Sequence, residues 1–288
     1  MKRIAFATFD ELPELEPDDY AVVQQLNSNK LKTDILLWDR NHVNWSDYQA
    51  VVIRSCWNYH LFPNEFLQWI DKLTDHGVTV YNNPEIIRWN LYKTYLRDLQ
   101  EQGIAIIPTR WFSKGESVNI KKVLEDENWN DAVIKPVVSL GSYKTWRYSN
   151  LSDSENQAEF DQLIKSNEMM IQEFQDSILS EGEYSFIFLN GRFRFAIVKK
   201  PVANEFRVQE EYGGSKDWIE VPESLIKQAE NVIDKIDADL LYARVDGVLK
   251  NGQLTLMELE LIDPSLYLNL HPQGINYFAE AIQERLSI

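Results

Sequence analysis

The residues best suited to chemistry lie on two apolar stretches that flank the pair Asn251-Gly252. Asp246 precedes this pair, and Glu258 and Glu260 follow it, two residues apart. An Asn-Gly pair between alternating apolar residues predicts a β-hairpin, whose period of two puts both glutamates on one face. Crowded carboxylates favour a cation between them, which predicts Mg²⁺ shared with phosphate oxygens rather than Ca²⁺. The alternative is an ordinary solvent-facing row of acids.

Several cations lie where apolar elements end. Lys93 follows Trp89-Asn90 in a predicted helix over 90–102, and Lys135 ends an apolar strand predicted over 132–136. A polar loop with Ser139, Gly141 and Ser142 follows. Lys199 ends the strand predicted over 193–199, and Arg207 precedes the pair Gly213-Gly214. Lysine and arginine beside small-residue loops suit a bound phosphate, although surface lysines whose stems cover apolar residues would give the same pattern.

Two further segments indicate a ligand. A strand predicted at Met170–Phe174 runs into a linker whose peptide edge suits a flat heterocycle, and Glu183 beyond it suits a ribose diol. In residues 1–85, strand and helix signals alternate and predict a small parallel sheet. Its third strand ends on Arg54-Ser55-Cys56-Trp57-Asn58-Tyr59. Ligands bind at the carboxyl ends of such strands, so this cluster is a candidate site.

The elements that must position these residues alternate along the chain without a repeat. Strands are expected at 4–8, 34–38, 50–54, 78–81, 109–112, 132–136, 144–148, 184–189, 193–199, 242–250 and 254–260. Helices are expected at 18–26, 63–76, 90–102, 119–125, 155–165, 222–236 and 274–286. Asn190-Gly191 predicts a second hairpin. The order predicts an α/β (α+β) fold.

Composition excludes several classes of function. The 288 residues carry 29 Lys and Arg against 45 Asp and Glu, a net charge of −16, and 44% are hydrophobic. This is a folded chain with no basic face for nucleic acid or an anionic membrane. No apolar run reaches the roughly 18 residues of a membrane span, and the single cysteine, Cys56, excludes an intrachain disulfide. A cytoplasmic protein with a small-molecule substrate is expected, and a homodimer stays open.

Taken in order, these features resemble the ATP-grasp superfamily over nearly the whole chain. Arg54–Tyr59, Asn83-Pro84 and Phe206-Arg207-Val208-Gln209 look more narrowly like its glutathione-synthetase-like branch, which includes the D-cycloserine-forming synthetase. The resemblance implies ATP-grasp architecture. In that architecture an N-terminal parallel α/β domain would span 1–90, a central lid subdomain 91–172 and a C-terminal subdomain with the metal site 173–288. The last two subdomains would clamp ATP.

The resemblance also implies a role for each position. ATP would be held by Lys93, Lys135, Ser139, Gly141, Ser142, Glu173, Phe174, Glu183 and Lys199. Two Mg²⁺ would be held by Asp246, Glu258 and Glu260. Catalytic charge would come from Arg207, Lys135 and Arg244, and substrate contacts from Arg54, Ser55, Trp57 and Asn58.

Members of the superfamily typically phosphorylate a carboxylate with ATP and let an amine attack the acyl phosphate, so a carboxylate–amine ligase or cyclase is expected. Four positions depart from the pattern. Glu260 stands where Asn is usual, Pro264 falls one residue later than is usual, and Cys56 and Asn58 stand where Thr and Asp are usual. Metal count and substrate are therefore the properties most exposed to change. A small-molecule kinase on the same fold and a non-catalytic ATP sensor are the alternatives. The four histidines give Cys56 no partner pattern, which favours a structural thiol.

Overall fold

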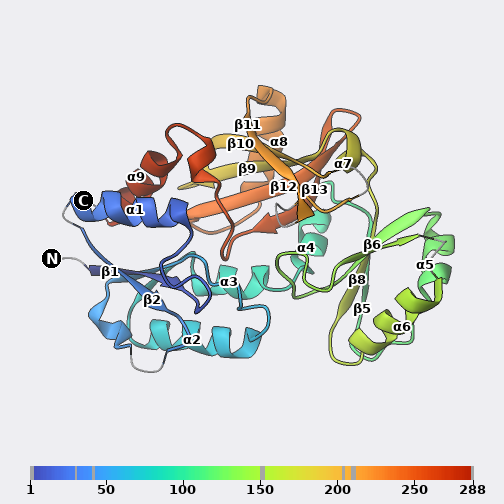
Figure 1. Cartoon of the computed structure of the whole chain (residues 1–288), viewed down its shortest axis with the longest axis horizontal. Helices are drawn as coiled ribbons and strands as arrows, with labels where there is room; N and C mark the ends of the chain where they lie inside the picture. The colour runs from blue at the N-terminus through green and yellow to red at the C-terminus, as the bar shows by residue number, and fades with distance from the viewer. Residues whose placement is uncertain are drawn as a thin grey trace.

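The part of the chain that the structure describes is organised around three β-sheets (Figure 1). The computed structural model describes residues 3–29, 31–40, 43–149, 153–202, 205–208 and 212–286. None of the helices in these ranges is long and apolar enough to span a bilayer.

The N-terminal sheet is parallel, with strand order β2-β1-β3-β4. Its elements are β1 (Arg3–Thr8), α1 (Pro17–Ser28), β2 (Lys32–Leu37), η1 (Trp45–Asp47), β3 (Ala50–Ile53), α2 (Pro63–Asp75), β4 (Thr79–Tyr81) and α3 (Pro84–Asn90). β1 and β3 are almost wholly apolar and buried, as expected for strands covered on both faces. The predicted parallel α/β arrangement is confirmed.

The second sheet is antiparallel, with order β5-β8-β6-β7, and lies at the right of Figure 1. It follows α4 (Tyr95–Glu101) and comprises β5 (Thr109–Phe112), α5 (Ile120–Glu127), β6 (Asp131–Pro136), β7 (Trp146–Ser149), α6 (Asp153–Leu163) and β8 (Met169–Glu173). α5 and α6 pack against the sheet and bury Leu124 and Phe160 with Ile134.

The third sheet, with order β11-β10-β9-β12-β13, is also antiparallel. Its elements are α7 (Ser177–Ser180), β9 (Glu183–Leu189), β10 (Arg192–Lys200), β11 (Ser215–Ile219), α8 (Glu223–Ile233), β12 (Tyr242–Lys250), β13 (Gln253–Glu260), η3 (Leu268–Leu270) and α9 (Gly274–Leu286). Both Asn-Gly pairs form the expected hairpin turns, with all four residues at positive φ between 51° and 73°.

Two predictions of local structure were wrong. The helix expected over 90–102 begins only at Tyr95, as α4. Residues 91–94 separate it from α3, which was not predicted, and the N–H of Lys93 in that break donates to the carbonyl of Val137 (3.0 Å). The strand expected from 144 begins at Trp146, because Lys144 takes a left-handed conformation (φ 49°). β11 was not predicted.

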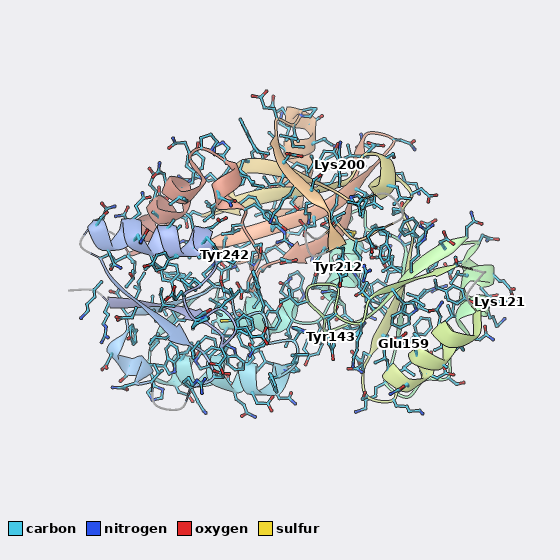
Figure 2. The ribbon with its side chains drawn as sticks, in the orientation of Figure 1. Lys121, Tyr143, Glu159, Lys200, Tyr212 and Tyr242 are labelled. Atoms are coloured by element: carbon cyan, nitrogen blue, oxygen red, sulfur yellow. The ribbon has the colours of Figure 1, made fainter. Side chains whose placement is uncertain are left out.

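Buried polar side chains join the N-terminal sheet to the third sheet. Tyr242 lies where the third sheet meets the N-terminal unit (Figure 2). Its hydroxyl lies within 3.0 Å of the carbonyl oxygens of Ile53, Tyr81 and Ile262. The amide of Asn82 donates to the carbonyls of Tyr242 and Leu261. Because hydrogen bonds between buried groups are costly to break, these contacts fix the end of β13 against the carboxyl end of β3.

Candidate functional site

A pocket of about 860 Å³ lies between the second and third sheets and reaches the N-terminal unit. One end is apolar and is lined by Ile107, Val133, Phe174, Ile178, Phe206, Val208, Val248 and Met257. These side chains form a separate apolar cluster, and they line the pocket instead of filling the space between them. Glu173 and Phe174, which were predicted to contact ATP, line this end of the pocket where β8 ends. The slot suits a flat apolar ring beside a peptide edge.

The other end is charged, and the register of the third sheet explains why. Lys216 of β11 lies opposite Lys199 of β10, which lies opposite Glu183 of β9. Two residues further along, Ser185, Asp246 and Glu258 form the next row, and Arg244 lies opposite Glu260 in the row after that. Side chains at a period of two share a face. Seven charged residues from five strands are therefore gathered on one side of the sheet.

The three predicted metal ligands are each paired with a cation. Asp246 accepts from Arg244 (2.9–3.0 Å) and from Ser185 (2.5 Å). Glu258 accepts from Lys93 (2.7 Å), and Glu260 forms an ion pair with Arg244. Within the described residues, no three acidic, His or Cys side chains are placed to hold a metal ion in this arrangement.

The electrostatics of these carboxylates differ. Burial opposes ionisation of Asp246 and Glu258, but Arg244 and Lys199 lower the pKa of Asp246, and Lys93 and Lys135 lower that of Glu258. Burial raises the pKa of Glu260 to about 7. Arg244 acts to lower this pKa, but the neighbouring carboxylates of Glu258 and Asp246 act to raise it. The donors are hard oxygens, and Glu260 lacks full compensation by positive charge, so the set fits Mg²⁺ chemically.

A β-bulge brings one further residue into the pocket. Asp246 pairs with Glu258, but the next residue, Gly247, pairs with Leu256, so Met257 is the extra residue of β13. Leu254, Leu256 and Leu259 bury into the opposite face of the sheet. Strict alternation from Glu258 would place Met257 with them, and the bulge instead lets it line the apolar slot.

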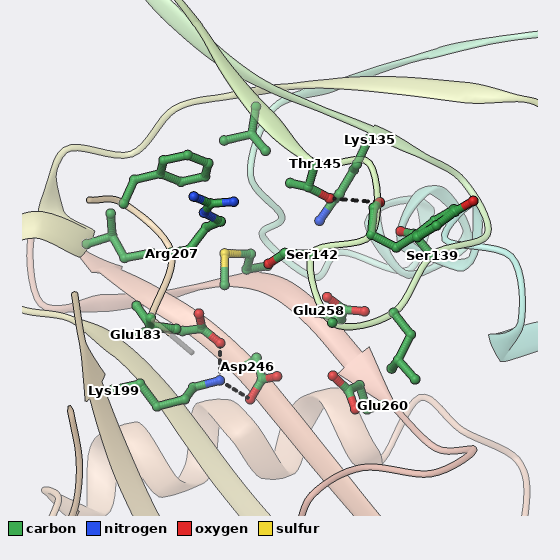
Figure 3. Close-up of a pocket in the computed structure, with 18 of the residues that line it drawn as sticks. Lys135, Ser139, Ser142, Thr145, Glu183, Lys199, Arg207, Asp246, Glu258 and Glu260 are labelled. Atoms are coloured by element: carbon green, nitrogen blue, oxygen red, sulfur yellow. Dashed lines mark hydrogen bonds and ion pairs between the residues drawn. The ribbon is translucent and has the colours of Figure 1, made fainter. Parts of the chain in front are cut away.

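Among the six cations predicted for the site, all of which the structure describes, Lys135 is the one without a hydrogen bond or ion pair. Its side chain projects into the pocket (Figure 3) and is 8% exposed. Its ammonium group makes no hydrogen bond or ion pair with any residue that the structure describes. Burial accordingly lowers its pKa, although Glu258 acts in the opposite direction. A buried charge is costly unless it is paired, so the structure leaves a place for an anion here.

Lys93 is placed differently from Lys135. Its ammonium group donates to Glu258 and to the carbonyl of Ser139 (2.8 Å). It therefore links a predicted metal ligand to the polar loop that follows β6.

That loop, residues 139–145, closes one side of the pocket. Gly141, Ser142 and Lys144 all have positive φ (58°, 60° and 49°), which coils the backbone tightly. Ser139 and Ser142 face the same space as Lys135 in Figure 3. Tyr143 reaches across to the N-terminal unit, where its ring meets His60 at 4.9 Å.

Arg207 also lines the pocket, but its own loop holds it. Glu205 accepts from Nε and Nη2 of Arg207 (3.1 and 2.7 Å), and the Tyr212 ring lies 3.6 Å from its guanidinium carbon. The hydrogen bonds from Arg207 lower the pKa of Glu205 to about 2. Glu183 and Lys199, predicted to contact ATP, form an ion pair with each other on the pocket wall.

Of the four predicted substrate residues, Trp57 alone lines this pocket. Arg54 is 1% exposed and donates to Asp19 (3.0 Å) and to the carbonyl of Pro264 (2.7 Å). The hydroxyl of Ser55 accepts from the backbone N–H of Glu16 (3.1 Å). The side-chain oxygen of Asn58 accepts from the indole of Trp38 (2.7 Å). These three residues lie behind the pocket wall.

Sequence reasoning missed several lining residues, among them His60, Tyr143, Lys216, Asp263 and Tyr267. Asp263 accepts from the backbone N–H groups of Ser55 (2.8 Å) and Cys56, so it fixes the loop that carries Trp57. Its position three residues after Glu260 was the available signal. The others come from segments that only the tertiary fold brings together.

Comparisons with known proteins show which chains this one is similar to. The family described as the N-terminal domain of D-cycloserine synthetase DcsG matches residues 4–82. The cycloserine biosynthesis protein DcsG of Streptomyces lavendulae is 26% identical over 295 residues, which cover 94% of this chain and 95% of that protein. The crystal structure of D-cycloserine synthetase DcsG superposes with a TM-score of 0.86 at 24% identity, covering 99% of both chains.

A more distant structure is the D-alanine–D-alanine ligase of Bacillus anthracis complexed with ATP. It superposes with a TM-score of 0.71 at 14% identity, covering 100% of this chain and 97% of that one. The protein has the ATP-grasp fold. The resemblance expected from the sequence, to the ATP-grasp superfamily and to the branch that includes the cycloserine-forming synthetase, is confirmed. The same agreement supports the expected class of enzyme, an ATP-grasp ligase that forms a C–N bond.

Proposed function

We propose that this ATP-grasp protein is an ATP- and Mg²⁺-dependent ligase or cyclase. Its substrate would be a small amino-acid-like or peptide molecule, activated as an acyl phosphate with release of ADP and phosphate. The observation that carries the proposal is the buried, unpartnered ammonium group of Lys135, which lies between an apolar slot and a face of carboxylates. A phosphate chain would reach from the slot to those carboxylates and pair the buried charge.

The nucleotide base fits the apolar end. The slot is walled by branched and aromatic side chains, and the peptide edge of Glu173–Phe174 borders it. Arg147 lies over the ring of Phe174 at 3.7 Å, which stiffens this wall. Lys93 and Lys135 would then meet the phosphates, beneath the loop formed by residues 139–145.

Magnesium fits the carboxylate end. Asp246, Glu258 and Glu260 would hold it, with two ions as the expected number, and the metal would supply positive charge to the phosphate oxygens. Lys93 and Arg244, which now pair with these carboxylates, would be free to turn toward phosphate once metal charge replaces theirs.

The acceptor substrate fits the third side of the pocket, against the N-terminal unit. Trp57 and His60 line it, and Asp263 anchors the loop that carries them. Arg54 and Ser55 support this loop from behind. Phosphoryl transfer asks the protein for position and charge, so Arg207, Arg244 and Lys135 would stabilise the negative charge that develops on the transferred group.

A screen for ADP release tests the proposal. The chain is incubated with Mg·ATP and panels of amino acids, dipeptides and ureido or hydroxylamino acids, and products are analysed by mass spectrometry. An amide or ring formed together with ADP and free phosphate is the expected result. EDTA should abolish ADP release and added Mg²⁺ should restore it. The proposal is wrong if Mg·ATP neither binds nor turns over with any panel.

The same products separate the alternatives. A stable phosphorylated compound without free phosphate would indicate a small-molecule kinase of the same fold. Tight ATP binding without turnover would indicate a sensor. The division into units over 1–90, 91–172 and 173–288, the cytoplasmic location and a homodimer stay predictions. The three separate sheets favour the first of these.

A further inference from the structure

His60 lies where the acceptor side of the pocket meets the loop formed by residues 139–145. It follows Trp57 by three positions in the turn after β3, and both side chains line the pocket. Its ring meets the ring of Tyr143 at 4.9 Å, and the Tyr143 ring lies 4.9 Å from Nζ of Lys144. His60 therefore borders both the proposed acceptor site and the loop beside the proposed phosphates.

The proposed reaction needs a group that accepts a proton. An amine of the expected, amino-acid-like kind is an ammonium ion at neutral pH, and it must lose a proton before it can attack a carbonyl carbon. A base that works at neutral pH ordinarily has a pKa near or below 7, which means a carboxylate or an imidazole. The described residues that line the pocket offer one imidazole, that of His60, and the carboxylates of Glu173, Glu183, Asp246, Glu258, Glu260 and Asp263.

Each of these carboxylates already has a partner or a proposed ligand. Three are the proposed metal ligands, and each of the three is paired with a cation. Glu183 is paired with Lys199, and Asp263 accepts from two backbone N–H groups. Glu173 accepts a hydrogen bond from a neighbouring side chain at the nucleotide end. None of the six is left to take a proton from an amine on the acceptor side.

The ring of His60 is held by no ion pair with a described residue. Its Nδ1 is buried and has no hydrogen-bond partner among those residues. The ring contacts Tyr59 and Tyr143, and the charge that acts on it is that of Lys93. Burial lowers the pKa of His60, the nearby backbone of Trp57 raises it, and Lys93 lowers it again. The imidazole is therefore neutral at pH 7, where it can accept a proton.

Resting on the proposed function, we propose that His60 is the general base of the ligation step. A ring nitrogen of His60 takes one proton from the substrate ammonium group. The freed amine attacks the carbonyl carbon of the acyl phosphate, and the bond from that carbon to the phosphate oxygen breaks. A second amine proton leaves on the phosphate, the amide keeps the third, and His60 returns its proton to water.

Hydroxylamine distinguishes a base from a residue that only shapes the pocket. It is unprotonated at neutral pH, so it attacks an acyl phosphate without losing a proton first. The amino acids of the ADP-release panel are incubated with Mg·ATP and with either hydroxylamine or the panel amine that gives wild type the most ADP. In His60→Gln, amide formation should slow about 10²-fold, with hydroxamate formation within about threefold of wild type. His76→Gln, an exposed histidine at the end of α2, is the matched control and should leave both rates unchanged.

The pH profile gives a second readout. Wild-type amide formation should fall as the pH drops through the lowered pKa of His60, because the protonated ring cannot accept a proton. In His60→Gln, amide formation should instead keep rising with pH as free amine becomes more abundant. His60→Ala serves if the Gln variant folds poorly. It leaves space where the ring was, and added imidazole should restore part of its lost rate of amide formation.

Equal losses of amide and hydroxamate in His60→Gln would overturn the proposal, because they would place His60 in an earlier step or in folding. Unchanged amide formation in that variant would overturn it as well. Failure of the proposed function looks different. A wild-type chain that forms neither product with any amino acid of the panel would refute the ligase, and this inference with it.

Discussion

Arg54 and Lys135 are both buried cations at the end of a strand, yet their surroundings are opposite. Arg54 donates to Asp19 and to the Pro264 carbonyl, lies 3.7 Å from Asp263, and stands over the ring of Tyr242. Lys135 has no bonded partner among the described residues and faces a cavity. Burial alone therefore does not mark a binding residue. The missing partner does, because the fold supplies one wherever the charge is structural.

The largest expected effect on stability comes from replacing Arg54, the buried cation that is paired within the fold. Arg54→Met should lower the free energy of unfolding by about 3–5 kcal/mol, since it strands two buried carboxylates. Urea denaturation measures this. Arg110→Met is the matched control, because the exposed Arg110–Glu127 pair should contribute less than about 1 kcal/mol. If both variants lost a similar free energy of unfolding, the distinction between a buried, paired cation and an exposed one would not hold.

Lys135→Met should impair activity and leave stability intact, the opposite of the result expected for Arg54→Met. Losing the charge that faces the phosphates is expected to slow ADP formation about 10²- to 10³-fold and to abolish the rise in melting temperature with Mg·ATP. The free energy of unfolding should not fall, since an apolar chain replaces an unpaired buried charge. Initial rates and thermal melts decide this. Full activity would show that Lys135 does not act on the phosphates, and marked destabilisation would show that it has a structural partner.

The contrast also explains what sequence could and could not predict. Local patterns determine the hairpin carrying Asp246 and Glu258 and the strand ending at Lys135, and these predictions are confirmed as elements. Arg54 looked equally suited to a ligand, because its partner Asp19 lies 35 positions earlier in a different element. Tyr267 carried no local signal. Pairing between distant residues is the information that a pattern of spacing lacks.

Asp263, which lies beside Arg54, should make the stability of the protein depend on pH. Burial raises its pKa to about 6, although Arg54 lowers it. An acid whose folded pKa lies above its ordinary value of 3.8 stabilises the fold most when protonated in both states, and this contribution is lost as pH rises through 6. Relative to Asp263→Asn, wild type should therefore lose roughly 2–3 kcal/mol between pH 4 and pH 7. Urea denaturation across that range tests it, and a difference that is flat or of opposite sign would contradict the assignment.

The smallest effects should separate two neighbours on one loop. Trp57→Ala removes a pocket-lining side chain and should raise KM for the non-nucleotide substrate about tenfold, with KM for ATP within about twofold, because only the acceptor side loses apolar contact. Asn58→Ala instead leaves the buried indole N–H of Trp38 without its acceptor and should cost about 1 kcal/mol of stability with both KM values unchanged. Steady-state kinetics and denaturation of both variants are needed together. If Asn58→Ala raised the substrate KM as much as Trp57→Ala does, the loop would act as one unit, and which way a side chain faces would no longer distinguish a binding residue from a supporting one.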